Sequence, residues 1–180
     1  MIEKFPLLKI LNVLRDQKEY SIRGIAKKTG IGVATAKTYM DYLSSKKIMK
    51  KKVVGRSHFY SFDISNFLAK SIKVTFSLSE INESGIVSEL LAKCPITSIV
   101  LYGSVARGED DLGSDIDMLI ITRKKHKIAS LRSEKKLKRE LALLSYTMQE
   151  WRSKSKEDKV FYDRVIIDGI PLYGEMPVMS

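Results

Sequence analysis

The 180-residue chain has one cysteine, one tryptophan, two histidines and four prolines. The single cysteine, Cys94, cannot form an intrachain disulfide, which is typical of proteins in a reducing compartment. No apolar run approaches the ~18 residues that a membrane span needs, and the first residues lack the pattern of a secretory signal. We therefore expect a cytoplasmic protein that does not enter a membrane.

Acidic residues are scarce in the first part of the chain. Residues 1–73 hold 16 Lys and Arg against 5 Asp and Glu, whereas residues 74–180 hold 16 of each kind. The formal net charge of +11 therefore comes entirely from the N-terminal part. Such an asymmetry indicates a module that binds nucleic acid or another anionic surface. A lysine-rich solubilising surface is the alternative.

The basic N-terminal part has the pattern of three helices followed by a hairpin. Apolar residues at 7, 8, 10, 11 and 14 predict an amphipathic helix, and Ser21 and Gly30 are the expected ends of a second helix. A third helix is predicted over 33–45, after a short turn that contains glycine. Two β-rich runs, KKVV and FYSF, follow around the turn GRSH.

This order of elements resembles a winged helix-turn-helix domain over residues 4–63. The resemblance implies that the helix at 33–45 lies in the major groove of DNA and that the hairpin contacts the DNA backbone. The residues that would contact bases or phosphates are polar or basic: Thr35, Lys37, Thr38, Lys51 and Arg56. DNA is thus an expected partner, and a homodimer is an option, because such domains often dimerise on palindromic sites. A protein-docking unit is the alternative.

We divide the sequence into three parts. Residues 1–65 are the expected winged helix-turn-helix domain, 66–93 a helical connector, and 94–180 a second domain. Within the connector, Ser79 is the expected start of the second helix and Gly85 a weak point in it. No low-complexity linker separates the parts, so the two domains are expected to be held fairly rigidly.

A motif at the start of the second domain brings small residues to the end of a strand. The β-branched run ITSIVLYG, at 96–103, predicts a buried strand that leads into Gly103 and Ser104. Such a turn lets the backbone approach a ligand closely, and it presents N–H groups and a hydroxyl to a phosphate. Arg107 can add charge-assisted hydrogen bonds to phosphate oxygens.

Two aspartates belong to the next predicted strand, SDIDMLIITR at 114–123. Asp115 and Asp117 are two residues apart, so they should point to the same face, about 6.6–6.8 Å apart along the strand. Two ionised carboxylates at this distance repel each other. A bound Mg²⁺ or Mn²⁺ would offset the repulsion and share its ligand shell with substrate phosphates. The turn and the aspartates together are parts of a phosphoryl or nucleotidyl transfer site.

The order Gly103, Ser104, Gly108, Ser114, Asp115 and Asp117 resembles the nucleotidyltransferase superfamily that includes DNA polymerase beta. GSVARG is especially similar to the minimal nucleotidyltransferases of bacteria and archaea, and the resemblance covers about 85–175.

This resemblance implies a small mixed β-sheet with helices on one side, so the whole chain should have an α+β fold. It also implies transfer of a nucleoside monophosphate from an NTP, with ATP the first choice, to an acceptor hydroxyl, which could lie on a partner protein. Asp115 and Asp117 would bind the metal. The nucleotide would be held by Gly103, Ser104, Arg107 and Ser114.

The pattern breaks at the third carboxylate, which the superfamily carries on the strand after the next helix. Here the helix is expected at 127–140, and the strand at 141–147 contains no acidic residue. Ala142 stands at the expected inward position, and Glu140, of the same parity, is the nearest candidate for the catalytic acid. The alternative is a catalytically weak or inactive domain that senses a nucleotide for a transcriptional regulator.

A polar helical stretch at 148–166 contains Trp151, Phe161 and Tyr162. Aromatic side chains in such a helix bury a large apolar area when they face the core. We expect these three residues to anchor the core rather than to stack on a nucleobase.

Overall fold

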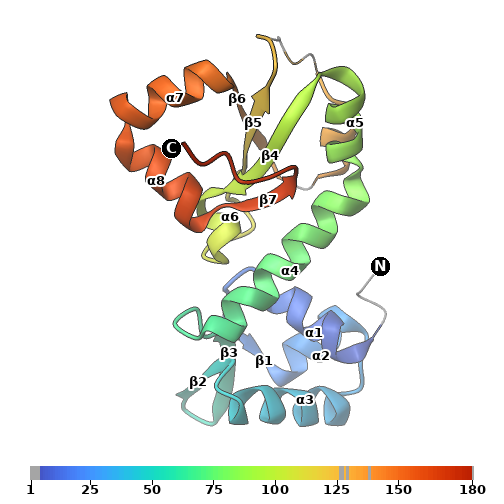
Figure 1. Cartoon of the computed structure of the whole chain (residues 1–180). Helices are drawn as coiled ribbons and strands as arrows, with labels where there is room; N and C mark the ends of the chain where they lie inside the picture. Colours follow the sequence, from blue (N-terminus) through green and yellow to red (C-terminus); the bar gives the residue numbers. More distant parts are fainter. Residues whose placement is uncertain (1–4, 126–127, 129, 138, 180) are drawn as a thin grey trace. The chain divides into compact units, whose positions relative to one another are not determined.

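The computed structural model describes residues 5–125, 128, 130–137 and 139–179. The chain folds into two compact units, Met1–Ser79 and Glu80–Ser180 (Figure 1). Each unit contains helices and a small sheet, so the predicted α+β class is confirmed. No helix in the described part of the chain is long and apolar enough to cross a membrane.

The first unit combines helices with a small antiparallel sheet. Its elements are α1 (Pro6–Leu14), β1 (Tyr20–Ser21), α2 (Ile22–Thr29), α3 (Val33–Ser45), β2 (Met49–Val54), β3 (Ser57–Phe62) and most of α4 (Phe67–Ser84). The strand order is β1-β3-β2, and β2 and β3 form a hairpin around Gly55 and Arg56. Three helices and a hairpin follow one another as the sequence predicted.

The ends of α2 are those that the sequence predicted. Ser21 Oγ accepts a hydrogen bond from Gly24 N at 3.1 Å, which satisfies one of the free N–H groups of the first turn. Gly30 ends the helix with a φ of 70°. Glycine adopts this left-handed conformation without steric strain, so it stops the helix and turns the chain toward α3.

One apolar core connects the helices of the first unit to its sheet. The core includes buried side chains from α1, α2, α3, β3 and α4: Leu14, Ile25, Met40, Tyr60 and Phe76. Arg15, only 3% exposed, lies against this core, where its guanidinium donates to Ser77 Oγ at 3.2 Å and lies over the Phe76 ring. The long stem of arginine can pack on apolar groups while its head stays hydrogen-bonded.

The connector breaks at Gly85, the predicted weak point, and not at Ser79, the predicted helix start. Helix α4 continues through Ser79, so the expected helix start at this serine is wrong. The break falls at Gly85, whose φ is 78°, and α5 (Ile86–Lys93) follows. A serine has no strong reason to interrupt a helix, whereas a glycine in the left-handed conformation ends one without Cβ strain.

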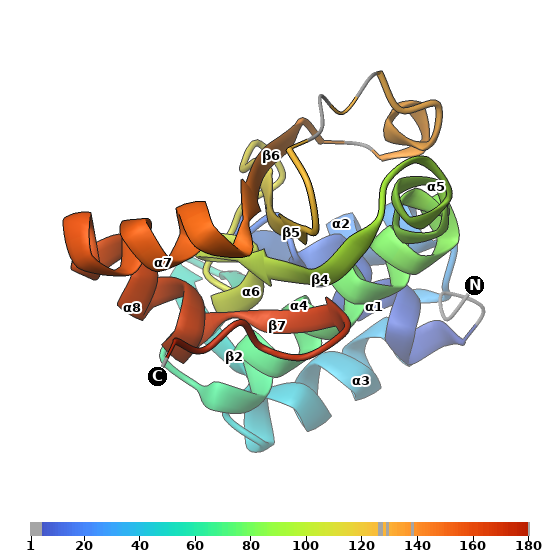
Figure 2. The ribbon, with the colours of Figure 1, turned by 45° about the horizontal axis from the view of Figure 1, so that its top comes forward.

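The second unit is built on a four-stranded mixed sheet. Its elements after α5 are β4 (Ile96–Tyr102), α6 (Gly103–Arg107), β5 (Ile116–Thr122), β6 (Leu141–Thr147), α7 (Met148–Glu157), α8 (Lys159–Asp168) and β7 (Ile170–Tyr173). The strand order is β6-β5-β4-β7, in which β5 pairs antiparallel with β4 and parallel with β6 (Figure 2). The predicted mixed sheet and its three long strands are confirmed.

The helix predicted at 127–140 is wrong. The described part of this segment contains only a 3-10 turn, η2 (Ser133–Lys136), and residues 127, 129 and 138 lie outside the described residues. The Glu89 carboxylate of α5 accepts hydrogen bonds from Arg132 N at 3.0 Å and Ser133 N at 2.8 Å. These N–H groups bind a side chain distant in sequence, so they are not used for a helix that runs through them.

Helices α7 and α8 cover one face of the four-stranded sheet, and α5 lies on its other side, so the expected placement of helices on one side alone is wrong (Figure 1). Trp151 is fully buried between helix and sheet, and its Nε1 donates to Pro177 O at 2.8 Å. Phe161 and Tyr162 pack on the same cluster, and both rings contact Trp151. The predicted role of the three aromatic residues as core anchors is confirmed.

Candidate functional site

The candidate site lies where β4 ends and β5 begins. The antiparallel register pairs Tyr102, the last residue of β4, with Asp117 of β5. The next residue, Gly103, has a φ of 77°, and a Cβ atom there would overlap the Asp117 carboxylate. Both the backbone conformation and the lack of space therefore require glycine at this position.

Asp115 and Asp117 flank Ile116 at the beginning of β5. Asp115 is exposed, whereas Asp117 is partly buried. Burial raises the pKa of the Asp117 carboxyl, the negative charge of Asp115 raises it further, and the positive charge of Arg107 acts in the opposite direction. Two like charges of which one is partly desolvated make a site that a cation would stabilise.

The donor set suits a cation that shares its ligands with a substrate. Mg²⁺ is commonly bound through one or two carboxylates together with waters and phosphate oxygens. Over residues 5–125, 128, 130–137 and 139–179, no group of three or more His, Cys, Asp or Glu is arranged to hold a metal ion. The two aspartates therefore fit a metal bridged by substrate and do not fit a metal cage built by the protein alone.

A methyl group occupies the position beside Asp117 where the third carboxylate was expected. The parallel register of β5 and β6 pairs Asp117 with Ala142. Paired residues of neighbouring strands project from the same face of a sheet, so Ala142 and Asp117 are neighbours on the candidate site's side. This agrees with the position that the sequence predicted for Ala142.

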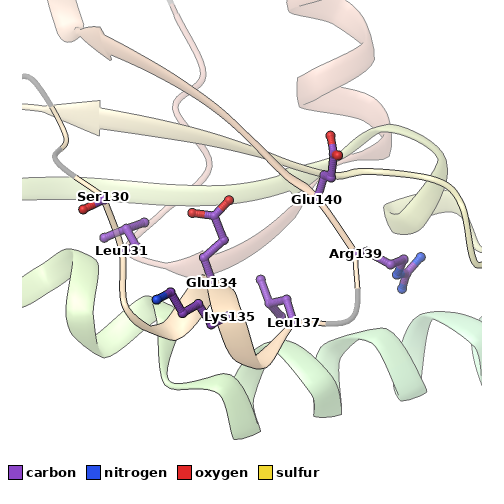
Figure 3. A pocket seen from close by; sticks show the side chains of 7 residues that line it. All are labelled: Ser130, Leu131, Glu134, Lys135, Leu137, Arg139 and Glu140. Atoms are coloured by element: carbon purple, nitrogen blue, oxygen red, sulfur yellow. The ribbon is translucent and has the colours of Figure 1, made fainter.

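Glu140 immediately precedes β6, and its backbone oxygen accepts a hydrogen bond from Ile116 N at 2.8 Å. Its exposed side chain lies at the rim of a hollow of about 500 Å³ (Figure 3). The other side chains that line this hollow come from residues 130–139 and not from the turn at Gly103 or from β5. Glu140 is thus close to the aspartates in register, and its catalytic role stays a prediction.

Arg107 and Ser114 have protein partners in this structure. Arg107 Nε lies 2.9 Å from Glu109 Oε2, and its Nη1 lies 3.6 Å from Asp168 Oδ2. Ser114 Oγ accepts from Asp111 N and donates to Asp111 Oδ1, both at 3.0 Å. A nucleotide would have to replace or extend these contacts, so the nucleotide-binding roles of Arg107, Ser114 and the Gly103–Ser104 turn stay predictions.

Tyr102 is a neighbour of the site that the sequence analysis missed. Burial raises the pKa of its hydroxyl to about 12, and the negative charge of Asp117 contributes to the rise. The Tyr102 ring meets Phe161 edge-on, with 5.6 Å between ring centroids. At neutral pH the hydroxyl of this residue, which pairs with Asp117 across the sheet, is therefore protonated. Only the pairing of β4 with β5 shows this, and no local sequence signal marks it.

A buried ion pair supports the loop between the turn and the aspartates. Arg139 Nη1 lies 2.6 Å from Asp110 Oδ2, and the side chains of Arg139 and Asp110 are 3% and 4% exposed. Glu80 lies 3.6 Å from the same guanidinium. Removal of one partner of such a pair leaves an uncompensated buried charge, which is strongly destabilising. In the sequence, Asp110 is one of several acidic loop residues, and nothing there distinguishes it.

The five residues predicted to contact DNA are all exposed. Three lie on α3 and two on the hairpin: Thr35, Lys37 and Thr38, then Lys51 and Arg56. Lys37 Nζ lies 2.6 Å from Asp41 Oδ2, and this contact raises the pKa of the lysine. Thr38 Oγ1 donates to Ala34 O at 3.1 Å within the same helix. Their contact with DNA stays a prediction.

The match with a known family falls in the second unit. Residues 83–167 match the family model described as a nucleotidyltransferase domain. The matched segment contains the Gly103–Ser104 turn and both aspartates, and it supports the assignment of this part of the chain to the nucleotidyltransferase superfamily. No curated protein matches the chain.

Three solved structures share limited similarity with the chain. A structure of the DNA recognition and protein interaction domains of HOP2 is 26% identical to the chain, with a TM-score of 0.30. The match covers 33% of this chain and 100% of that chain. Bordetella bronchiseptica BpsR is 21% identical, with 49% of this chain and 71% of that chain covered and a TM-score of 0.36. The DNA-binding protein Sso10a-2 from Sulfolobus solfataricus is 22% identical, with 49% of this chain and 97% of that chain covered and a TM-score of 0.32. At these TM-scores the likeness carries no conclusion about function.

Proposed function

We propose that the second unit binds an NTP with Mg²⁺ and transfers its nucleoside monophosphate to an acceptor hydroxyl, while the basic first unit, a winged helix-turn-helix domain, binds DNA. The observation that carries the proposal is the close approach of the Gly103 turn to Asp117. A phosphate at this turn would lie beside the two aspartates. The raised pKa of Asp117 supports a cation at the same place, because the cation would relieve the repulsion from Asp115.

The residues of the site have separate roles in this proposal. The backbone N–H groups and hydroxyl of Gly103 and Ser104 bind phosphate oxygens. Asp115 and Asp117 hold the metal, which when bound stabilises the negative charge on the transferred phosphoryl group. Arg107 exchanges an acidic neighbour for a phosphate oxygen. The acceptor oxygen bonds to the α-phosphorus, the bond to pyrophosphate breaks, and the hydroxyl proton passes to Glu140 or to solvent.

A second candidate function follows from Ala142. A general base contributes roughly 10²–10⁴-fold to a rate, and the methyl group beside Asp117 provides none. A site with two carboxylates still binds a metal-bound nucleotide but turns it over slowly or not at all. Joined to a DNA-binding unit, it would make the protein a nucleotide-sensing transcriptional regulator.

Labelled ATP separates the two functions. An enzyme transfers label from the α-phosphate of ATP to an acceptor in cell extract, and Asp115→Ala/Asp117→Ala abolishes the product. A regulator binds ATP with Mg²⁺ in calorimetry and forms no product. In that case Ala142→Asp, which restores a carboxylate beside Asp117, should raise transfer by about 10²-fold or more. Absence of ATP, GTP, CTP and UTP binding by the wild type would contradict both functions.

DNA binding by the first unit is tested separately. Lys51→Gln/Arg56→Gln should weaken binding to duplex DNA and reduce the slope of log affinity against log salt by about 2, if each residue contacts one phosphate. Lys156→Gln/Lys159→Gln, which removes two exposed charges from the second unit, is the matched control. An equal loss in both double variants would mean that the first unit is not the DNA-binding surface.

A further inference from the structure

The two edges of the four-stranded sheet differ in their protection. Strand β7 has four residues, contains Pro171 and pairs with β4 through an irregular register. Short strands, prolines and irregularities are features that keep other strands from pairing with an edge. Strand β6, in contrast, is the seven-residue run LALLSYT without proline, glycine or charge. Figure 2 shows β6 at the end of the sheet, and among the described strands only β5 pairs with it.

The hydrogen-bond pattern shows which backbone groups of β6 face outward. The bond from Ile116 N to Glu140 O starts a parallel ladder that extends to the pair Thr122 and Thr147. In such a ladder, alternate residues direct their N–H and C=O groups to the same neighbouring strand. The groups directed to β5 are those of Ala142, Leu144 and Tyr146. The groups directed outward are those of Leu141, Leu143 and Ser145.

We propose that β6 pairs antiparallel with β6 of a second copy of this chain, so that the two sheets join across a two-fold axis. The axis passes at Leu144, the middle residue of the strand. Because Leu144 directs its backbone groups to β5, the two copies of Leu144 form a non-hydrogen-bonded pair, whose side chains are closest to each other. The side chain of Leu144 is 37% exposed in one copy, and the second copy covers it.

The same register brings complementary side chains together. Leu143 and Ser145 become the hydrogen-bonded pairs on both sides of the axis, through the backbone groups that face outward. Ala142 lies opposite Tyr146 of the second copy, so a small residue faces a large one. Ala142 is also the neighbour of Asp117, and the second copy's Tyr146 therefore borders the candidate site.

The charges at the ends of β6 favour a second copy over an unrelated strand. In this register Glu140 lies opposite Met148, the first residue of α7 in the other copy. That terminus already carries the Glu150 carboxylate, which caps the helix and lies 3.2 Å from Lys125 Nζ. Lys125 is 87% exposed, so in the dimer its charge would lie between Glu150 and the Glu140 of the second copy. The two-fold axis makes this contact twice, which is a property of isologous interfaces.

Light scattering of the full chain after gel filtration tests the proposal. The wild type should have twice the mass of one chain at micromolar concentration. Ser145→Pro removes an outward N–H group, which an edge strand tolerates, and Leu144→Lys places two like charges at the axis. Both variants should be monomers. Ser145→Ala keeps the N–H group and should stay a dimer.

A charge exchange provides an independent test. Glu140→Lys should weaken the dimer about tenfold or more, and Lys125→Glu in the same chain should restore it. Circular dichroism establishes that each variant is folded. If Ser145→Pro does not fold, Leu144→Lys and the charge exchange test the dimer without it. A monomeric wild type overturns the proposal. So does a dimer that persists in folded Leu144→Lys, because it would form through another surface.

Discussion

Gly103 brings the turn after β4 against the Asp117 carboxylate, so a single methyl group there should damage the site. Gly103→Ala adds a Cβ atom that overlaps this carboxylate and forces a left-handed φ on alanine. We expect the affinity for ATP with Mg²⁺ to fall about tenfold or more, measured by calorimetry. At Gly113 a Cβ atom would meet Asp111 at an ordinary 3.4 Å, so Gly113→Ala is the matched control. Equal affinities in the two variants would contradict the prediction.

Glu89 stabilises the segment before η2 in a pH-dependent way. The hydrogen bond from Lys93, together with the N–H groups of Ser133 and Arg132, holds the pKa of Glu89 well below its usual range. A carboxyl whose pKa is lowered in the folded state stabilises the fold above its unfolded pKa of about 4.3, and this contribution is lost as the pH falls below that value.

Glu89→Gln should therefore lower the stability at about pH 7 and reduce the loss of stability on acidification to about pH 3, because glutamine cannot ionise. Urea unfolding at a series of pH values measures both effects. Glu134→Gln, in the exposed part of η2, is the matched control. Identical pH profiles for wild type and Glu89→Gln would show that the Glu89 contacts do not contribute.

At the scale of elements, α7 is attached to the sheet by Trp151. Trp151→Phe keeps an aromatic ring, but it loses the hydrogen bond to Pro177 O and leaves unfilled volume in the cluster with Val100 and Val165. We expect the free energy of unfolding to fall by about 2 kcal/mol, from a lost hydrogen bond and a small cavity. Denaturant unfolding measures the change. Met148→Ala, at a residue 45% exposed, should change stability by less than about 0.5 kcal/mol.

The elements that the sequence predicted well are those that local residues determine. Ser21 and Gly30 define α2, and uninterrupted apolar runs define β4 and β6, because caps and periodicity act over a few residues. The helix predicted at 127–140 is wrong because Glu89, about forty residues earlier, binds two of its N–H groups. Ser79 did not start a helix, since the glycine that follows at position 85 provides the stronger break.

At the scale of the whole molecule, the two units differ in net charge. Residues 1–79 carry the entire net charge of +11, and residues 80–180 are neutral. DNA affinity should therefore fall steeply with salt, with a slope of log affinity against log salt near −0.9 for each phosphate contact. Fluorescence anisotropy in about 50–200 mM salt measures this slope. Nonelectrostatic binding, with a slope near zero, would contradict the proposed DNA binding by the first unit.

The sequence by itself determined the mixed α+β composition, the charge division and the order Gly103, Ser104, Asp115 and Asp117, because each depends on residue types or on short spacing. Because side chains alternate along a strand, the sequence also predicted that Ala142 stands where the third carboxylate was expected. The roles of these residues in catalysis and binding stay predictions.

Only the tertiary structure decided which distant residues meet. The register of β4 with β5 placed Tyr102 opposite Asp117, and the buried pair of Arg139 and Asp110 joined two loops. Among the described strands, the strand order left β6 at the edge of the sheet, where only β5 pairs with it. Pairing between strands and burial of charges depend on contacts between segments far apart in the chain, and local sequence patterns do not specify such contacts.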